Sequence, residues 1–172
     1  MPSSLAAAAL AAMLVDQTGH GFTLASLHGR PAIVTFVSAH CTDACPLIDA
    51  QFAAAATRIA HDGLPARLVT ITLDPRRDTP ATMHALAKRF DADPRHWLVA
   101  GGAPDRIDAV LRAFGVVTET APDGDREAHT TFVYVLDGEG RVVRTMLASA
   151  ELSDDLVNAA RALAKTEDRG SL

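Results

Sequence analysis

The chain contains only two cysteines, Cys41 and Cys45, and both lie in the short stretch from His40 to Pro46. A chain of 172 residues can bury a large core and does not need disulfide bonds for stability. Closing so short a loop also stabilises a fold very little. We therefore interpret the pair as chemically reactive and keep an inert buried disulfide as the alternative.

Basic clusters and long apolar runs are also missing. The net charge is −5 and there is no long run of Lys and Arg, which argues against nucleic acid as a partner. The apolar stretch from Leu5 to Val15 is shorter than the roughly 20 residues needed to cross a bilayer, and no Lys or Arg precedes it as in a signal peptide. We expect residues 1–12 to be an Ala-rich extension, and any membrane anchor to lie outside this chain.

Alternating and periodic apolar residues predict an α/β protein. Met13 to Val15 and Phe22 to Leu24 flank a glycine-containing loop and predict an N-terminal β-hairpin. Ile33 to Val37 is apolar on both faces, as in a central strand. Further strands are expected at 67–73, 97–100, 131–136 and 141–147, and helices after Pro46, Pro80, Pro104 and Ser153.

This order of elements is typical of a thioredoxin-like fold, with a central mixed β-sheet flanked by helices. We assign the domain to residues 13–165 and expect 166–172 to be a polar, mobile tail. Asp78 or Thr79 can cap the helix that begins near Pro80, and Asp74 is interpreted as a turn residue at a strand end. A role for either aspartate beside the thiols is the less favoured interpretation.

The thiols follow a strand and precede a helix, where the helix dipole is expected to ease their deprotonation. The thiolate is both a nucleophile and a metal ligand, so the pair can exchange as a disulfide or hold a soft metal. Two sulfurs favour copper(I), zinc or an iron–sulfur cluster over hard cations. Zinc is the weaker hypothesis, because structural zinc sites need four ligands and the sequence offers no fourth.

Among seven histidines, His129 is the candidate third ligand. It immediately precedes a predicted strand that would lie beside the strand ending at Val37, so its loop would face the cysteines. Two Cys and one His suit a three-coordinate copper site. His40, next to Cys41, is a candidate for tuning the thiol or gating access to it. The remaining histidines are interpreted as surface or hydrogen-bonded residues: His20, His28, His61, His84 and His96.

Three motifs in order resemble the Sco/SenC family of copper proteins of cytochrome c oxidase assembly. They are Cys41-x-Asp43-x-Cys45-Pro46, then Asp74-Pro75-x-x-Asp78-Thr79-Pro80, then His129-Thr130-Thr131 followed by Asp137-x-x-Gly140. The opening hairpin is similar too, and the resemblance extends from about Leu14 to Leu163. Departures lie just before and within the cysteine motif, where Phe36 to Ala39 replaces an aromatic-Gly segment and Thr42 replaces a common Pro. The stretch between Gly115 and His129 is also shorter than in many members.

The resemblance implies one copper ion, copper(I) or copper(II), held by Cys41, Cys45 and His129. It implies a role in building the copper A centre of cytochrome c oxidase. The partner would be subunit II of that oxidase or another copper or thiol protein. It further implies a periplasmic or other extracytoplasmic location and a membrane tether, and we expect a monomer.

We therefore predict a copper metallochaperone rather than an enzyme. The alternative is a thiol–disulfide oxidoreductase, in which Cys41 and Cys45 are catalytic and reduce the cysteines of a copper-site partner. A peroxidase of the peroxiredoxin type shares the fold but needs a different arrangement around one cysteine, so it ranks below both.

Overall fold

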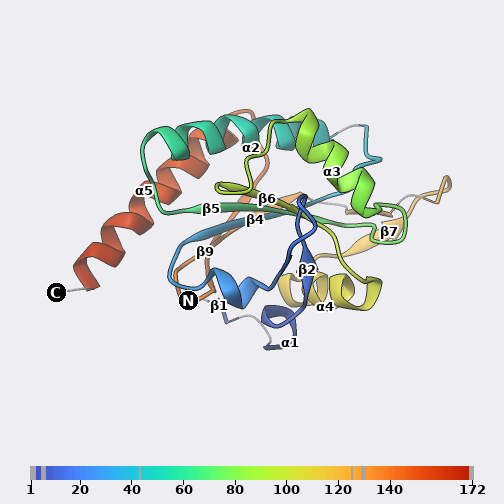
Figure 1. Cartoon of the computed structure of the whole chain (residues 1–172), viewed down its shortest axis with the longest axis horizontal. Helices are drawn as coiled ribbons and strands as arrows, with labels where there is room; N and C mark the ends of the chain where they lie inside the picture. The colour runs from blue at the N-terminus through green and yellow to red at the C-terminus, as the bar shows by residue number, and fades with distance from the viewer. Residues whose placement is uncertain (1–2, 5–6, 43, 125, 129–130, 171–172) are drawn as a thin grey trace.

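A mixed β-sheet forms the middle layer of the molecule, with helices on both faces (Figure 1). The computed structural model describes residues 3–4, 7–42, 44–124, 126–128 and 131–170. The strand order is β1-β10-β9-β4-β5-β6. The strands are β1 (Ser3–Ser4), β4 (Ala32–Val37), β5 (Arg67–Thr72), β6 (Trp97–Ala100), β9 (Phe132–Leu136) and β10 (Arg141–Leu147).

Strands β4, β5 and β6 are parallel, whereas β9 runs antiparallel to β4, and β10 antiparallel to β9. Every residue of β4 is buried, as expected for a strand covered on both sides. Side chains alternate along it: Ile33 and Val37 face one apolar core, and Val34 and Phe36 face the other. The prediction of a thioredoxin-like α/β fold with a mixed central sheet is confirmed.

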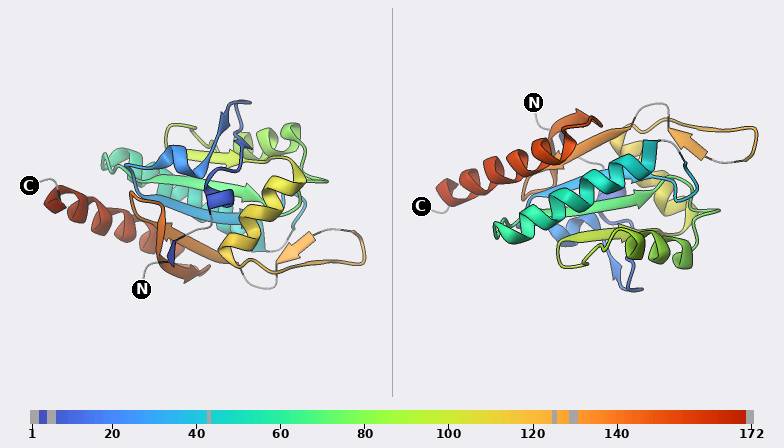
Figure 2. Two further views of the ribbon diagram at one scale, coloured as in Figure 1. Left: turned by 90° about the horizontal axis from the view of Figure 1, so that it is seen from below. Right: turned by 90° about the horizontal axis from the view of Figure 1, so that it is seen from above.

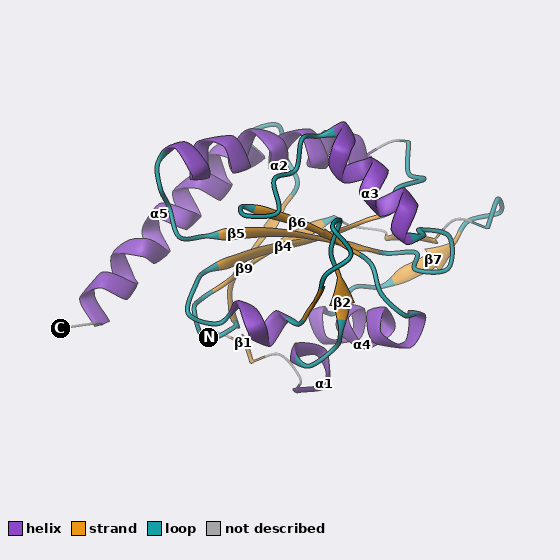
Figure 3. Ribbon diagram, in the orientation of Figure 1, coloured by secondary structure: helices purple, strands orange, loops and turns teal. Residues whose placement is uncertain are grey.

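The helices divide between the two faces (Figures 1 and 3). Three helices cover the first core: α2 (Ala44–His61), α3 (Pro80–Arg89) and α5 (Leu152–Gly170). Two helices and a 3-10 turn cover the second: α1 (Ala7–Leu10), α4 (Pro104–Phe114) and η1 (Leu24–Leu27). Helix α4 starts at Pro104, as predicted, and ends at Phe114; the capping residue Gly115 has a φ of 70°, the left-handed conformation that favours glycine.

Two small hairpins accompany the sheet. The first, β2 (Leu14–Val15) with β3 (Gly21–Phe22), is the predicted N-terminal hairpin. The second, β7 (Thr118–Thr120) with β8 (Arg126–Ala128), was not predicted, because its strands are three residues long and show no apolar alternation. Figure 2 shows the turn of this second hairpin projecting from the end of the molecule opposite the C-terminus.

Both termini extend the expected domain. Ala9 and Ala12 are fully buried in the second core, so the segment interpreted as an extension packs onto the sheet. At the other end α5 continues to Gly170, past the expected boundary at 165. Among the helices in the described part of the chain, none has the length and apolar character needed to span a membrane.

Candidate functional site

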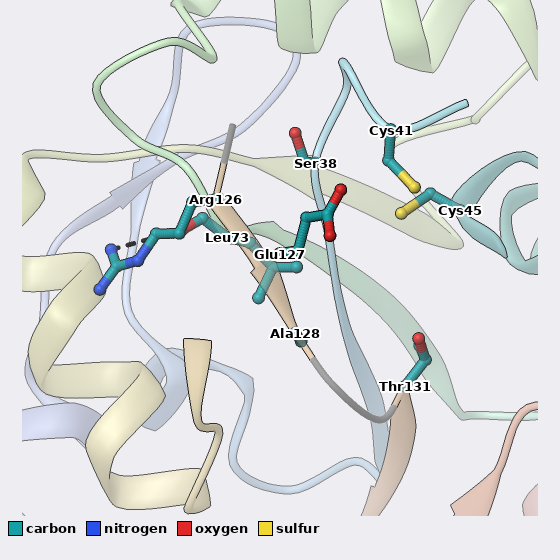
Figure 4. A pocket seen from close by; sticks show the side chains of 8 residues that line it. All are labelled: Ser38, Cys41, Cys45, Leu73, Arg126, Glu127, Ala128 and Thr131. Atoms are coloured by element: carbon teal, nitrogen blue, oxygen red, sulfur yellow. Dashed lines mark hydrogen bonds between the residues drawn. The ribbon is translucent and has the colours of Figure 1, made fainter. Parts of the chain in front are cut away.

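The two thiols lie where the central strand β4 passes into helix α2. Cys41 is in the connecting loop and Cys45 is in the first turn of α2, which begins at Ala44, two residues before the predicted start. Both cysteines are free thiols. Figure 4 shows their sulfur atoms turned toward each other.

The thiols border a hollow of about 150 Å³. Its walls come from the loop after β4, α2, the end of β5, strand β8 and the start of β9 (Figure 4). The lining residues are Ser38, Cys41, Cys45, Leu73, Arg126, Glu127, Ala128 and Thr131. The unpredicted hairpin therefore forms one wall of the site.

The two cysteines differ in exposure and in acidity. Cys41 is half-buried, whereas only 6% of Cys45 is exposed. Burial raises the pKa of the Cys45 thiol far above its ordinary value, and a hydrogen bond with the Cys41 thiol and the nearby charge of Asp49 raise it further. The expectation of easier deprotonation is therefore wrong for Cys45, because loss of solvent disfavours its thiolate.

Asp78, whose side chain is fully buried, holds the loop that carries Cys41 in place. Its carboxylate accepts hydrogen bonds from the backbone N–H of Ala39 at 3.2 Å and the hydroxyl of Thr72 at 2.6 Å. It also contacts His40 Nδ1 at 2.9 Å. The interpretation of Asp78 as a helix cap is wrong: Thr79 caps α3, accepting from the N–H of Thr82, and Asp78 supports the cysteine loop.

Replacing Asp78 by alanine should therefore loosen the thiol site. The Asp78→Ala variant leaves the Ala39 N–H and the Thr72 hydroxyl without an acceptor, and we expect the free energy of unfolding to fall by about 2 kcal/mol. We also expect faster alkylation of Cys45 by a small thiol reagent. Urea unfolding and timed alkylation measure the two effects.

The neighbouring variant Thr79→Ala is the control for Asp78→Ala. It removes a helix cap worth about 1 kcal/mol, yet it does not touch the cysteine loop. An equal rise in Cys45 alkylation in both variants would contradict the supporting role of Asp78.

Arg126 fastens the hairpin wall to the body of the molecule. Its backbone N–H donates to Asp74 Oδ2 at 3.1 Å, and its guanidinium donates to Asp108 Oδ1 at 2.8 Å and Thr118 Oγ1 at 2.8 Å. Asp74 also closes the turn after β5, accepting at its backbone carbonyl from Arg77 and Asp78, so its predicted turn role is confirmed. Asp74 thus connects two walls of the hollow, the end of β5 and strand β8.

Asp49 is a buried carboxyl one helical turn after Cys45, and the sequence analysis did not single it out. Only 1% of the residue is exposed, and among the described residues its Oδ1 has no hydrogen-bond partner. Burial raises its pKa to about 7, and the charge of Arg89 offsets only part of that increase. The i, i+4 spacing from Cys45 was the one signal available in the sequence.

His129, the predicted third ligand, lies outside the described residues, as does Asp43 of the cysteine motif. Ala128 and Thr131, on either side of positions 129 and 130, both line the hollow. Within the described ranges, no three His, Cys, Asp or Glu side chains are grouped closely enough to hold a metal ion. The His129 ligand therefore stays a prediction.

The other histidines have ordinary contacts where the structure shows them. His20 Nδ1 lies 2.6 Å from Thr18 Oγ1, His61 Nδ1 3.0 Å from Asp62 Oδ1, and His84 Nδ1 2.9 Å from the carbonyl of Gln17. For these three the interpretation as hydrogen-bonded residues is confirmed. His40 supports the loop through Asp78 and does not line the hollow.

Comparison with known proteins connects this site to a family. The SCO1/SenC family model matches residues 9–165. The chain is 29% identical over 127 residues to Protein SenC of Rhodobacter capsulatus, which covers 72% of this chain. It spans 56% of the length of that relative.

Solved structures agree with this match. Bradyrhizobium japonicum ScoI with copper bound has a TM-score of 0.73 and 31% identity, covering 86% of this chain and 96% of its own. Arabidopsis thaliana ScoI with copper bound has a TM-score of 0.74 and 25% identity, covering 94% of this chain and 98% of its own.

Proposed function

This chain belongs to the SCO1/SenC family, and we propose that it binds one copper ion through Cys41, Cys45 and His129 and transfers it to a partner protein. The observation that carries the proposal is the convergence of two free thiols in one hollow, bordered on both sides of position 129 by Ala128 and Thr131. Copper is here the cargo of the protein. Two similar ScoI proteins hold copper in their solved structures, which supports the choice of metal.

The donor set suits this ion. Thiolate sulfur is a soft ligand that selects copper(I), and an imidazole nitrogen also suits copper. Because the Cys45 thiol is buried and has a raised pKa, binding must displace its proton, and the bond to the metal must outweigh that cost. Asp78 contributes by holding the Cys41 loop in place before the ion arrives.

The recipient we propose is subunit II of cytochrome c oxidase, where the copper A centre would be assembled on copper-ligand cysteines. A recipient of this kind, with its own thiols, can take copper by ligand exchange. The resemblance to the family supports this partner and an extracytoplasmic, membrane-tethered setting for the domain.

A second function is favoured by the unequal exposure of the two thiols. The half-buried Cys41 can attack a partner disulfide, forming a mixed disulfide and releasing one partner thiolate, which takes up a proton. The buried Cys45 then attacks Cys41, closing the Cys41–Cys45 disulfide and releasing the second partner thiol. A strongly reducing potential and fast exchange in the absence of metal would favour this thiol–disulfide oxidoreductase function.

The copper proposal is tested by removing the imidazole. In the His129→Ala variant, we expect copper(I) affinity to fall at least tenfold, the scale seen even for residues that only support metal ligands. Stoichiometry should be one copper per reduced chain in the unmodified protein, measured by competition with a chelator and by absorption spectra.

The exposed His61→Ala variant is the control for His129→Ala, since its imidazole contacts the neighbouring Asp62 and lies at the far end of α2 from the cysteines. Unchanged affinity and spectra in His129→Ala would defeat the three-ligand proposal.

A further inference from the structure

Among the described residues that line the hollow beside the thiols, one is acidic, Glu127 of strand β8. Figure 4 shows this side chain extending from the strand toward the side of the hollow where the sulfurs lie. Among the described lining residues the one basic residue is Arg126, and Figure 4 shows its side chain directed away from the cysteines. Its guanidinium is paired with Asp108. The described walls therefore present negative charge to the space beside the thiols without a compensating cation.

The position of Glu127 follows from the strand geometry. Successive side chains of a strand point to opposite sides, so fastening Arg126 against Asp108 and Thr118 directs Glu127 to the other side, into the hollow. The hairpin wall is therefore built to hold this carboxylate in place.

The cross-strand partner of Glu127 is also acidic. Glu119 of β7 is paired directly opposite it, and both residues are exposed. Like charges at directly opposite positions disfavour strand pairing.

We propose that Glu127 is a specificity-determining residue, whose charge shifts the preference of the thiol pocket toward divalent copper(II) relative to monovalent copper(I). The inference rests on the proposed copper function. No three potential ligands are grouped among the described residues, so Glu127 acts across the hollow through its charge and not as a ligand. The attraction between two charges scales with their product, so one carboxylate attracts a divalent ion twice as strongly as a monovalent ion.

The test is the Glu127→Gln variant, which removes the charge and keeps the shape. We expect copper(I) affinity to fall about threefold and copper(II) affinity about tenfold, because the divalent factor is close to the square of the monovalent one. Silver(I) and cadmium(II), soft ions that do not oxidise thiols, should repeat the pattern. Added salt should shrink both factors, since it screens the charge of an exposed carboxylate.

Glu119→Gln is the matched control, with the same loss of charge at the facing position, outside the lining. It should change the ratio of the two affinities less than Glu127→Gln, and Glu127→Asp should retain most of the preference. If Glu127→Gln lowers the affinity for both ions by the same factor, or if Glu119→Gln has an equal effect, the inference is overturned while the copper function stays intact. Absence of copper binding by the unmodified protein overturns the proposed function and this inference together.

Discussion

Replacing Cys45 by serine should lower copper(I) affinity by about a thousandfold. The variant removes a soft ligand and one unit of negative charge that faces the ion. A pair of unit charges about 4 Å apart is worth roughly 4 kcal/mol at an effective dielectric constant of 20, and each 1.4 kcal/mol is a factor of ten in affinity. Chelator competition on the reduced protein, without oxygen, measures the loss.

The same variant separates the two candidate functions. In thiol exchange, Cys41 is the accessible nucleophile and Cys45 the buried residue that resolves the mixed disulfide. Cys45→Ser should then trap a mixed disulfide between Cys41 and the partner, visible by mass spectrometry, whereas Cys41→Ser should trap none. If copper transfer is the function, both variants lose copper binding to a similar extent, and neither accumulates a mixed disulfide with the partner.

A Cys45→Ser protein that binds copper(I) as tightly as the unmodified chain would contradict the two-thiol site altogether. Because Cys45 packs in the first core, stability must be measured alongside affinity. Serine is close in size to cysteine but leaves a buried hydroxyl, for which a cost of about 1–3 kcal/mol is expected. Cys45→Ala leaves no hydroxyl and serves as the second variant.

The framework of the fold was predictable because its signals are local. The apolar run in β4 identifies a strand covered on both faces, and Thr79-Pro80 marks the start of α3. Gly115 marks the end of α4. Each of these features depends on residues within a few positions of one another, so the sequence carries them without knowledge of the rest of the molecule.

The supports of the site were not predictable in the same way. Asp78 acts on Ala39, which is 39 residues away in the sequence. Asp78 also fits a capping pattern well, so a local reading assigns it the wrong role. Likewise, hairpin β7–β8 forms a wall of the site because Arg126 bonds to Asp74 and Asp108. Its short polar strands have no apolar pattern from which these contacts could be predicted.

A buried carboxyl next to the thiols gives the molecule a stability that depends strongly on pH. The pKa of Asp49 is raised from the usual 3.8 to about 7, which means that ionisation is disfavoured in the folded state. Well below pH 3.8 the carboxyl is protonated in both states and no penalty exists. Between pH 4 and 7 the unfolded chain ionises more readily, so the free energy of unfolding falls, and above about pH 7 the full penalty remains.

The Asp49→Asn variant should remove this penalty. Each pKa unit corresponds to about 1.4 kcal/mol, so we expect a gain of about 4 kcal/mol at pH 8.5 and almost none at pH 4, where asparagine resembles the protonated acid. Urea unfolding of the reduced, metal-free protein across this range provides the measurement.

The control Asp105→Asn removes an exposed carboxylate from the first turn of α4, where it complements the helix dipole. It should cost about 0.3–1 kcal/mol near neutral pH, with the opposite sign. An Asp49→Asn protein with the same pH profile as the unmodified chain would show that Asp49 is solvated or paired in solution. The charge of Asp49 would then be screened from Cys45 and would no longer account for part of the raised pKa of that thiol.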